Sequence, residues 1–373
     1  MKKIKVIDLF SGVGGFSLGF HEFEEFEIVF ANDIWDDAAE TYTFNLPETV
    51  FFKEDIQKIN SDSLLKYGFK NIDVIIGGPP CQGFSVCGTR EPCDDRNFLV
   101  MEFARIVDIL KPKIFIMENV KGFLSMKNPK GIYFKDELIK KLKNIYNIEI
   151  NILKAHLFGV PQKRERVFIV GIRKDIKIPV SKIWPLPKYS ETDTGIPLFA
   201  EKPITVGEAI IDLPNADSPF GELEYGSTLN RFTKKIRKDA KKIFNHELPK
   251  HSKIVIERMK FVPPGGNWKN IPKDIRPGGN HSNLYKRLDL NSPSVTIKHP
   301  IKSMIIHPIY DRCLSVREAA RLQSFPDNFI FKGSKTSQYQ QIANAVPPLL
   351  SEAIAESVLN ILKNLKNRSL ANV

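Results

Sequence analysis

The feature that most constrains the fold of this chain is the alternation, across residues 1–173, of short apolar runs with longer amphipathic stretches. Such runs are typical of strands buried on both faces, and the stretches between them are typical of crossover helices. The runs predict strands at 4–10, 27–31, 50–53, 74–77, 114–117, 148–154 and 166–172, with helices at 98–110 and 136–146. We therefore expect an α/β domain built around a parallel sheet.

The pattern changes after residue 173. Prolines become frequent, clean periodic runs are few, and two loops at 263–266 and 277–279 combine proline with glycine. Scattered aromatic residues favour a second domain that is irregular but folded. Regular structure returns with a short helix at 316–323, begun by Ser315 and Glu318 at capping-box spacing, and a longer amphipathic helix at 347–365.

Composition excludes several classes of protein. With 42% hydrophobic residues the chain can bury a core, which argues against disorder. The first residues lack the apolar segment of an export signal, and no run approaches the roughly 18 apolar residues of a membrane span. We expect a cytoplasmic protein with free thiols and no membrane contact. Cys81, Cys87 and Cys93 are spaced more widely than zinc ligands, so no metal is predicted.

A glycine-rich turn follows the first predicted strand. Gly12, Gly14 and Gly15 let the backbone bend sharply and let a ligand approach the carboxyl end of the strand. Ser17 occupies the place of the third glycine of a dinucleotide-binding turn, and no Lys-Ser/Thr pair follows as in a P-loop. The turn predicts a ligand site of another kind, with a purely structural turn as the alternative.

Acidic residues follow the next two strands. Asp33 lies about 20 residues past the glycines, where doubly wound folds bind ribose hydroxyls. Asp55 follows the third strand and is placed to accept a hydrogen bond from an adenine amine. The two acids predict a nucleoside cofactor, and without a third glycine the turn suits S-adenosylmethionine better than NAD.

A thiol is predicted at the same edge of the sheet. Cys81 follows the strand at 74–77 and two prolines, Pro79 and Pro80, which restrict the loop. This thiol is a candidate nucleophile, and it needs basic neighbours or backbone donors to become a thiolate. The alternative is a small buried apolar side chain.

Glu118 follows another apolar strand. Apolar surroundings disfavour the ionised form of a carboxyl group, so Glu118 is a candidate general acid, with turn capping as the alternative. Farther along, a period of two predicts Gln162, Arg164 and Arg166 on one face of a strand. Two adjacent guanidinium groups suit a phosphate, a carboxylate or a base carbonyl, and surface ion pairing is the alternative.

Eight blocks, in order along the chain, carry a resemblance to a known family. They lie at 8–15, 32–33, 55–56, 79–82, 118–120, 162–166, 317–327 and 341–348. Together they resemble the motifs of DNA (cytosine-5)-methyltransferases of the restriction-modification type. The resemblance implies a Rossmann-like S-adenosylmethionine-dependent methyltransferase sheet with helices on both faces, plus a smaller irregular target-recognition domain. It implies a catalytic domain at 1–178, target recognition at 179–312 and a C-terminal segment, 313–373, that returns to the catalytic domain.

The resemblance also implies the chemistry. Cys81 would attack carbon 6 of cytosine while Glu118 supplies a proton or hydrogen bond at ring nitrogen 3. Arg164 and Arg166 would hold the base and its phosphate and orient Glu118. Carbon 5 would take the methyl group of S-adenosylmethionine, leaving S-adenosylhomocysteine. The residues implied in cofactor binding are Phe10, Gly12, Gly14, Asp33, Ile34, Asp55, Ile56, Pro79, Leu99, Asn344, Ala345 and Val346. The family often has an aromatic residue at the position of Ile34, so whether Ile34 or Trp35 covers the adenine stays open.

Double-stranded DNA is the implied substrate, with the target cytosine flipped out of the duplex. The segment 231–242 holds seven Lys or Arg residues against one acid, a density suited to phosphates. A helix at 233–244 with a solvated lysine face is the alternative, and the glycines near 265 and 278 can equally be plain turns. The predicted DNA contacts are Gln82, Ser85, Arg231, Lys234, Lys235, Arg237, Lys238, Asn280, His281 and Arg287.

The net charge of +12 also fits a polyanionic partner, although background composition alone can give a basic protein. We expect a monomer that shares its DNA site with a cognate restriction endonuclease without forming a stable complex with it. A tRNA cytosine-5 methyltransferase is the alternative enzyme, and the long segment between Gly171 and Arg317 favours DNA over it. A catalytically inactive DNA-binding homologue is the non-enzymatic alternative.

Overall fold

The chain divides into two compact units, each assembled from separate parts of the sequence. The computed structural model describes residues 3–60, 64, 69, 71–80, 98–190, 201–227, 230–238, 240–279 and 283–370, with side chains in the last helix up to residue 365. Unit 1 comprises Met1–Lys154, Glu165–Leu186 and Leu350–Val373, and unit 2 comprises Ala155–Arg164 and Pro187–Leu349. Residues 313–349 thus belong to the same unit as most of the irregular segment. The predicted functional roles of 1–178, 179–312 and 313–373 stay predictions.

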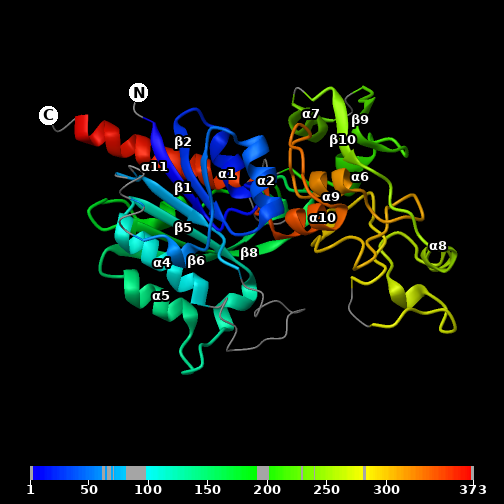
Figure 1. Cartoon of the computed structure of the whole chain (residues 1–373), viewed down its shortest axis with the longest axis horizontal. Helices are drawn as coiled ribbons and strands as arrows, with labels where there is room; N and C mark the ends of the chain where they lie inside the picture. Colours follow the sequence, from blue (N-terminus) through cyan, green and yellow to red (C-terminus); the bar gives the residue numbers. More distant parts are fainter. Residues whose placement is uncertain are drawn as a thin grey trace. The chain divides into compact units, whose positions relative to one another are not determined.

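A seven-stranded sheet forms the centre of unit 1 (Figure 1). Its strands are β1 (Ile4–Leu9), β2 (Phe26–Asp33), β3 (Val50–Lys53), β4 (Val74–Gly77), β5 (Ile114–Asn119), β6 (Tyr146–Lys154) and β8 (Glu165–Arg173), in the order β3-β2-β1-β4-β5-β8-β6. The order reverses between β1 and β4, so the carboxyl ends of these two strands lie at the switch point where doubly wound folds bind ligands.

All seven predicted strands are confirmed, with ends that differ by no more than two residues. One feature of the sheet differs from the prediction, because β8 runs antiparallel to both β5 and β6. An apolar run shows that a strand is buried but not its direction, which the connection to its neighbours determines.

Helices cover both faces of the sheet (Figure 1). On one face, α4 (Leu99–Leu110) and α5 (Phe134–Leu142) pack on a core that includes Ile7, Leu9 and Phe115. On the other face lie α1 (Gly15–His21) and α11 (Pro348–Leu370). These two helices approach so closely that a Cβ at Gly19 would lie 2.3 Å from the backbone nitrogen of Glu352. The predicted Rossmann-like architecture is confirmed.

The predicted helix at 136–146 is wrong at its end. It stops at Leu142, and Tyr146 begins β6. The Tyr146 hydroxyl donates to the carbonyl of Pro112 at 2.8 Å, and its ring packs edge-on against Phe115. These tertiary contacts stabilise the strand over the local helical pattern.

Unit 2 is less regular but has buried cores of its own. Its helices are α6 (Val206–Ile210), α7 (Arg231–Arg237), α8 (Lys253–Lys260), α9 (Val316–Leu322) and α10 (Lys335–Asn344), and its strands form the pairs β9 (Ser218–Glu224) with β10 (Lys242–His246) and β7 (Gln162–Lys163) with β11 (Ser294–Val295). The capping box of Ser315 and Glu318 at the start of α9 is confirmed. The alternative helix at 233–244 is wrong, because Lys238 has a φ of 46° after α7 and Phe244 of β10 pairs with Phe220 of β9.

Buried charges connect the elements of unit 2. Arg321 is fully buried and bonds to Asp327 and Asp212, while Arg312 bonds to Glu318 with two nitrogens at 2.8 Å. A buried ion pair is stable only when each charge keeps its partner. Because Arg312, Glu318 and Arg321 must keep theirs, these contacts determine how α9 packs.

One helical stretch among the described residues, Lys335–Leu365, is long and apolar enough to cross a membrane by length and composition. Most of its apolar part is buried inside the protein, as in the core helix of a soluble protein.

Candidate active site

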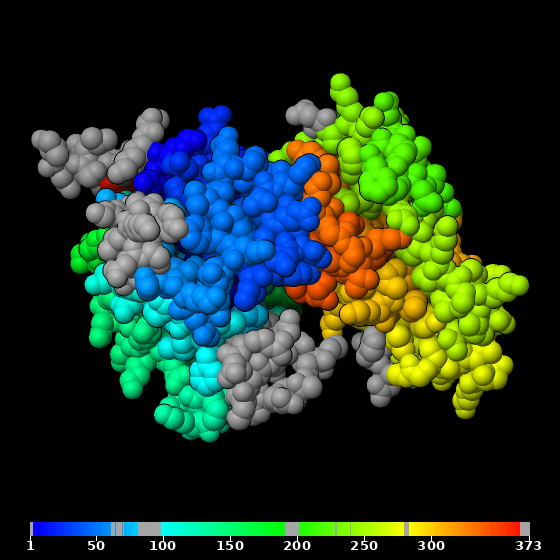
Figure 2. Space-filling view, viewed as in Figure 1, coloured from blue at the N-terminus to red at the C-terminus, as the bar shows by residue number. Residues whose placement is uncertain are grey.

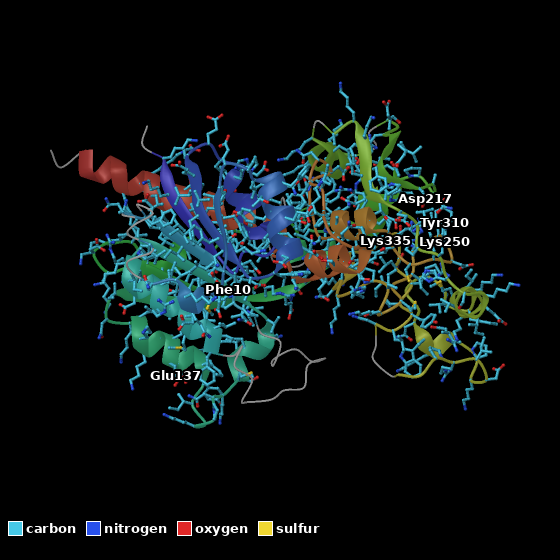
Figure 3. The ribbon with its side chains drawn as sticks, in the orientation of Figure 1. Phe10, Glu137, Asp217, Lys250, Tyr310 and Lys335 are labelled. Carbon is cyan, nitrogen blue, oxygen red and sulfur yellow. The ribbon has the colours of Figure 1, made fainter. Side chains whose placement is uncertain are left out.

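The glycine turn leaves β1 with three successive departures from ordinary backbone. Phe10, which follows β1 directly (Figure 3), has a φ of 55°, and Gly12 and Gly14 have φ values of 53° and 88°. A Cβ at Gly14 would lie 2.8 Å from the ring of Tyr42, whereas one at Gly12 would meet no atom of the described residues within 4 Å. The backbone conformation of the turn therefore requires glycine at both positions, and packing against Tyr42 requires it at Gly14 as well. The space over Gly12 is open among the described residues.

Asp33 holds the glycine turn against the end of β2. Its two carboxylate oxygens accept the backbone N–H groups of Gly12 at 2.8 Å and Trp35 at 2.9 Å. Burial raises the pKa of Asp33, and these backbone donors oppose the rise. The predicted acid thus lies beside the predicted glycines.

Asp55 begins the short helical turn η1 (Ile56–Lys58) and accepts from the N–H of Gln57 at 3.0 Å. The buried Asn32 amide joins this region to β2, because its nitrogen donates to the carbonyls of Phe52 and Glu54. Both predicted acids therefore lie at the carboxyl edge of the sheet. The sequence places Asn32 in one of the motifs but does not indicate this anchoring role.

The other predicted cofactor residues of unit 1 differ in exposure. Ile56 and Pro79 are buried, Leu99 is half-buried at the start of α4, and Ile34 is 68% exposed. Ile34 belongs to the segment at the start of α2 (Asp36–Asn45), which is blue in the space-filling view (Figure 2). A large apolar side chain left this exposed is suited to cover a flat ligand, as is the half-buried Trp35 beside it.

Glu118 and Arg166 form a pair at the same edge of the sheet. Glu118 is the second-last residue of β5, with 8% of its surface exposed, and its Oε1 lies 2.9 Å from Nε of Arg166 on β8. An added Cβ at Gly78, just past β4, would lie 3.5 Å from the other carboxylate oxygen. Because a guanidinium stabilises a neighbouring negative charge, this geometry does not favour the predicted neutral carboxyl before substrate binds.

The single strand face predicted for Gln162, Arg164 and Arg166 is wrong. Gln162 lies in β7, Arg166 lies in β8, and Arg164 separates the two strands. Arg164 is 1% exposed and donates to the carbonyls of Ala343 and Ala345 at 2.9 and 3.1 Å. In this structure Arg164 therefore anchors the loop after α10 of unit 2.

The predicted C-terminal cofactor residues are Asn344, the last residue of α10, and Ala345 and Val346 in the loop after it. Val346 is buried, and Asn344 is exposed and accepts from Gln340 at 2.8 Å. Gln323 supports the loop by donating to the carbonyl of Ala345 at 2.7 Å and accepting from Gln162 at 2.6 Å. The roles of Asn344, Ala345 and Val346 toward the cofactor stay predictions. Gln323 has no distinctive signal in the sequence beyond its place in a motif.

Several predicted site residues lie outside the described part of the chain. Cys81, Gln82 and Ser85 fall in the segment 81–97, and Asn280 and His281 fall in 280–282. Their predicted roles rest on the sequence alone.

The predicted DNA contacts of unit 2 fall into two groups. Lys234, Lys235 and Lys238 are exposed, as is Arg231, which pairs with Glu201. With Lys241 and Tyr225, Lys234 and Lys238 line a cavity of about 440 Å³.

The second group consists of two buried arginines. Arg237 is 6% exposed and bonds to Asp212 at 2.7 Å, and Arg287 is 5% exposed and donates to Asp311 and to several carbonyls. Their geometry favours a structural role for both over a DNA contact.

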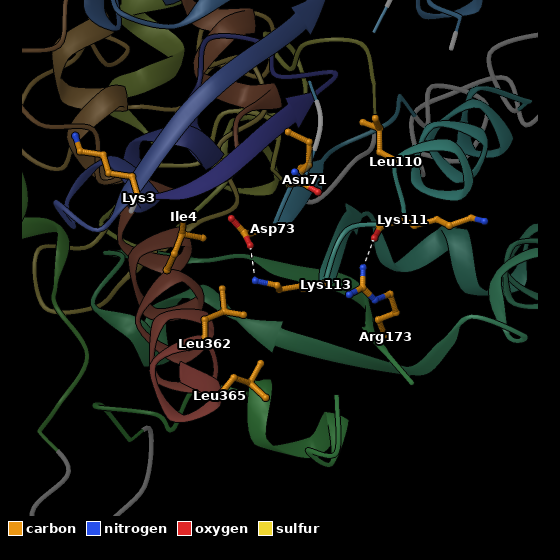
Figure 4. A pocket seen from close by; sticks show the side chains of 11 residues that line it. Lys3, Ile4, Asn71, Asp73, Leu110, Lys111, Lys113, Arg173, Leu362 and Leu365 are labelled. Atoms are coloured by element: carbon orange, nitrogen blue, oxygen red, sulfur yellow. Dashed lines mark hydrogen bonds and ion pairs between the residues drawn. The ribbon is translucent and has the colours of Figure 1, made fainter. Parts of the chain in front are cut away.

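A cavity of about 500 Å³ lies at the opposite, amino edge of the sheet in unit 1 (Figure 4). Three of its polar side chains have partners in its lining, since Lys113 bonds to Asp73 at 2.7 Å and Arg173 donates to the carbonyl of Lys111 at 2.7 Å. This cavity is therefore separate from the edge that carries the glycine turn and Glu118.

The structure defines a doubly wound α/β fold that carries a glycine turn, two acids and a carboxylate–guanidinium pair at the carboxyl edge of its sheet, where such folds bind ligands. The sequence matches the model for C-5 cytosine-specific DNA methylases over residues 4–360. It is 36% identical over 401 residues to the type II methyltransferase M.DdeI of Desulfomicrobium norvegicum, covering 99% of this chain and 92% of that protein.

Two further comparisons agree. The chain is 36% identical over 363 residues to the type II methyltransferase M1.HphI of Haemophilus parahaemolyticus, covering 96% of this chain and 87% of that protein. A prophage-encoded E. coli protein assigned as a DNA modification methyltransferase has a crystal structure that matches with a TM-score of 0.78 at 31% identity, covering 97% of this chain and 100% of that one.

The chain belongs to the C-5 cytosine-specific DNA methylase family. It is a DNA (cytosine-5)-methyltransferase, as the resemblance predicted, and the comparisons support this activity over the tRNA alternative. Members of the family use S-adenosylmethionine.

The residues of unit 1 fit this cofactor. The space over Gly12 is open, Asp33 and Asp55 lie at the ends of β2 and β3, and the buried Oδ1 of Asp8 beneath the turn has no hydrogen-bond partner among the described residues. When bound, S-adenosylmethionine supplies an activated methyl group.

Proposed function

We propose that the chain methylates carbon 5 of one cytosine in a short, specific duplex sequence, as the protective partner of a restriction endonuclease. The similarity to M.DdeI and M1.HphI over nearly the whole chain supports this role, because both are type II methyltransferases. We propose that the protein works as a cytoplasmic monomer without a resident metal, and that the endonuclease shares its DNA site without a stable complex.

The observation that carries the catalytic proposal is the contact between Arg166 and Glu118 at the ligand-binding edge of the sheet. In the proposed reaction the Cys81 thiolate adds to carbon 6, and Glu118, oriented by Arg166, stabilises the developing negative charge at ring nitrogen 3 through a hydrogen bond or proton. Carbon 5 then forms its bond to the transferred methyl group. Loss of the carbon-5 proton restores the double bond and expels the thiolate.

The structural role of Arg164 leaves Arg166 as the guanidinium best placed to act on Glu118. Arg164 has carbonyl partners at Ala343 and Ala345, so we propose that it fixes the loop carrying Asn344 and Val346.

Cytosine in a duplex cannot present carbon 6 to a protein thiol, so the proposed reaction requires the base to flip out, at a cost of a few kcal/mol. Contacts to the DNA backbone offset this cost. We propose that exposed lysines of α7 supply part of them, and that unit 2 reads the sequence. Gln82 and Ser85 would contact the substrate strand.

The test is expression in a host free of cytosine methylation, followed by genome-wide mapping of 5-methylcytosine. We expect methylation at one recurring sequence with the wild-type chain and none with Cys81→Ser. Cys313→Ala is a matched control because Cys313 is buried in a separate core of unit 2, and it should retain methylation.

Three outcomes would contradict the proposal. Labelled tRNA with unlabelled DNA would favour the tRNA alternative, and sequence-specific DNA binding without methyl transfer would favour an inactive homologue. Methylation spread over all cytosines would refute the role in protecting a specific site.

A further inference from the structure

A buried carboxyl group lies beneath the glycine turn. Asp8 occupies β1 and is 1% exposed. Its Oδ2 accepts a hydrogen bond from the Ser17 hydroxyl at 2.6 Å, and its Oδ1 has no hydrogen-bond partner among the described residues. No basic side chain in the described part of unit 1 forms an ion pair with it. A buried acid with so little compensation costs stability, which favours a functional reason for its presence.

Ser17 and Tyr42 fix the direction of this carboxyl. The Ser17 oxygen lies 2.8 Å from the Tyr42 hydroxyl, and both residues are fully buried. Because Ser17 uses its only proton on Asp8, it accepts from Tyr42. The tyrosine ring also lies against Gly14, where an added Cβ would be 2.8 Å away. The three side chains therefore connect β1, α1 and α2 around the turn.

A second acid faces the same turn. Asp33 bonds to the N–H of Gly12, and the register neighbours of Asp8 on β2 and β4 are Ala31 and Ile76. Among the described residues, the titratable groups that act on Asp8 are Asp33 and Tyr42. Burial raises the pKa of Asp8 to about 7, the Ser17 hydrogen bond opposes the rise, and the charge of Asp33 adds to it. Asp8 is thus poised to gain or lose its proton near neutrality.

We propose that Asp8, held by Ser17 and Tyr42, is a positioning residue whose ionised carboxyl favours S-adenosylmethionine over S-adenosylhomocysteine at the glycine turn. The inference rests on the proposed function and specifies how the site distinguishes substrate from product. The two ligands differ by the methyl group and the positive charge on sulfur. An uncompensated negative charge beneath the turn stabilises the ligand with the positively charged sulfur more than the product that lacks this charge.

The experiment measures the dissociation constants of both ligands for the full chain, without DNA, by calorimetry between pH 5.5 and 8.5. In the wild type, the ratio of the S-adenosylhomocysteine constant to the S-adenosylmethionine constant should rise with pH through about 7. In Asp8→Asn this ratio should be lower, with only the residual pH dependence due to Asp33. The ligand amino group titrates alike in both proteins, so it cancels from the comparison.

Ser17→Ala supplies the second test. It removes the donor that stabilises the ionised carboxyl, so the midpoint of the rise should move to higher pH. Tyr42→Phe keeps the ring against Gly14 and removes only the hydroxyl, so it should move the midpoint less and in the same direction. A purely structural role would weaken both ligands equally at every pH and leave the midpoint unchanged. Thermal unfolding monitors folding of each variant.

The outcomes separate this inference from the proposed function. If the wild type methylates DNA while Asp8→Asn keeps the wild-type ratio and pH dependence, the inference fails alone. If Asp8→Asn does not fold, an unmoved midpoint in Ser17→Ala is sufficient to overturn it. If the wild type binds neither ligand at any pH and methylates no DNA, the proposed function fails with it.

Discussion

Nε of Arg166 lies 2.9 Å from Oε1 of Glu118, and both side chains are almost buried where β5 and β8 pair. Glu118→Gln keeps the shape of the side chain and removes its charge. We expect turnover to fall by about 10²- to 10⁴-fold, the range of general acid–base contributions, with little change in cofactor affinity. Single-turnover methylation of a duplex, with calorimetric cofactor binding beside it, measures the two effects separately.

Arg166→Lys tests the orientation of Glu118 rather than its chemistry. Lysine keeps the positive charge but lacks the planar guanidinium group, so turnover should fall less than in Arg166→Gln and stay below the wild type. Equal losses of turnover and cofactor affinity in these variants would indicate that the pair only stabilises the fold.

Gly14→Ala should lower the free energy of unfolding by about 2–4 kcal/mol and abolish cofactor binding, because it adds a clash with the Tyr42 ring to the strain of a φ of 88°. Gly131→Ala is the matched control. Gly131 also has positive φ, at 78°, but an added Cβ there would meet nothing within 4 Å, so only about 1 kcal/mol should be lost. Urea unfolding of both variants checks the difference, and equal losses would show that packing at Gly14 contributes nothing.

The strands and the carboxyl-edge site were predictable because each depends on local sequence. An apolar run such as 74–77 is buried whatever its neighbours are, and Gly12, Asp33 and Glu118 each lie within three residues of the end of a strand at the same sheet edge. The direction of β8 and the break at Arg164 depend instead on partners distant in the chain. Arg164 bonds to Ala343, 179 residues away, which no local period indicates.

Charge density was the least informative part of the sequence. The run at 231–242 correctly indicates a basic surface, yet Arg237 within it is buried because Asp212, 25 residues earlier, supplies its counter-charge. Arg287 has the same relationship with Asp311. A sequence shows how many cations a segment has but not which of them are paired.

Asp327→Ala should destabilise unit 2 by about 3–5 kcal/mol, because it leaves the buried guanidinium groups of Arg321 and Arg317 without one of their counter-charges. Lys335→Ala, which breaks the exposed pair with Glu247, is the control and should cost no more than about 1 kcal/mol. Urea titration followed by circular dichroism compares the two. A loss as small as that of the control would mean that solvent reaches the buried arginines.

Burial of His307 should contribute stability that is lost on acidification from about pH 6.5. Nδ1 of His307 accepts the N–H groups of Ile309 and Tyr310, and burial lowers the His307 pKa to about 4. The pKa of Glu318 is lowered to about 2 because the hydrogen bonds and charge of Arg312 outweigh its burial. Both residues bind fewer protons in the folded than in the unfolded chain, so His307 loses stability between pH 6.5 and 4 and Glu318 from 4.5 toward 2.

Asp8 acts in the opposite direction. Its raised pKa means that the folded protein takes up this proton first, so protonation adds stability as the pH falls from about 7 to 3.8. His307→Gln should remove a slope of up to about 1.4 kcal/mol per pH unit between pH 6.5 and 4. Chemical unfolding at several pH values measures the slope, and a variant with the wild-type slope would exclude His307 as its source.

The exposed lysines of α7 should act on DNA affinity rather than on sequence choice. Lys234 and Lys238 line the basic cavity of unit 2 without contributing to its core. Replacing both with alanine should reduce the magnitude of the slope of log affinity against log salt by about 2, because each phosphate contact contributes about 0.9. The methylated sequence should stay the same.

The matched control is the double variant Lys140→Ala with Lys141→Ala, two exposed lysines on α5 of unit 1, which should leave the slope unchanged. Equal reductions in both double variants would mean that the lysines of α7 contribute only to the general charge of the protein, whereas a changed methylation site would place them among the residues that read bases.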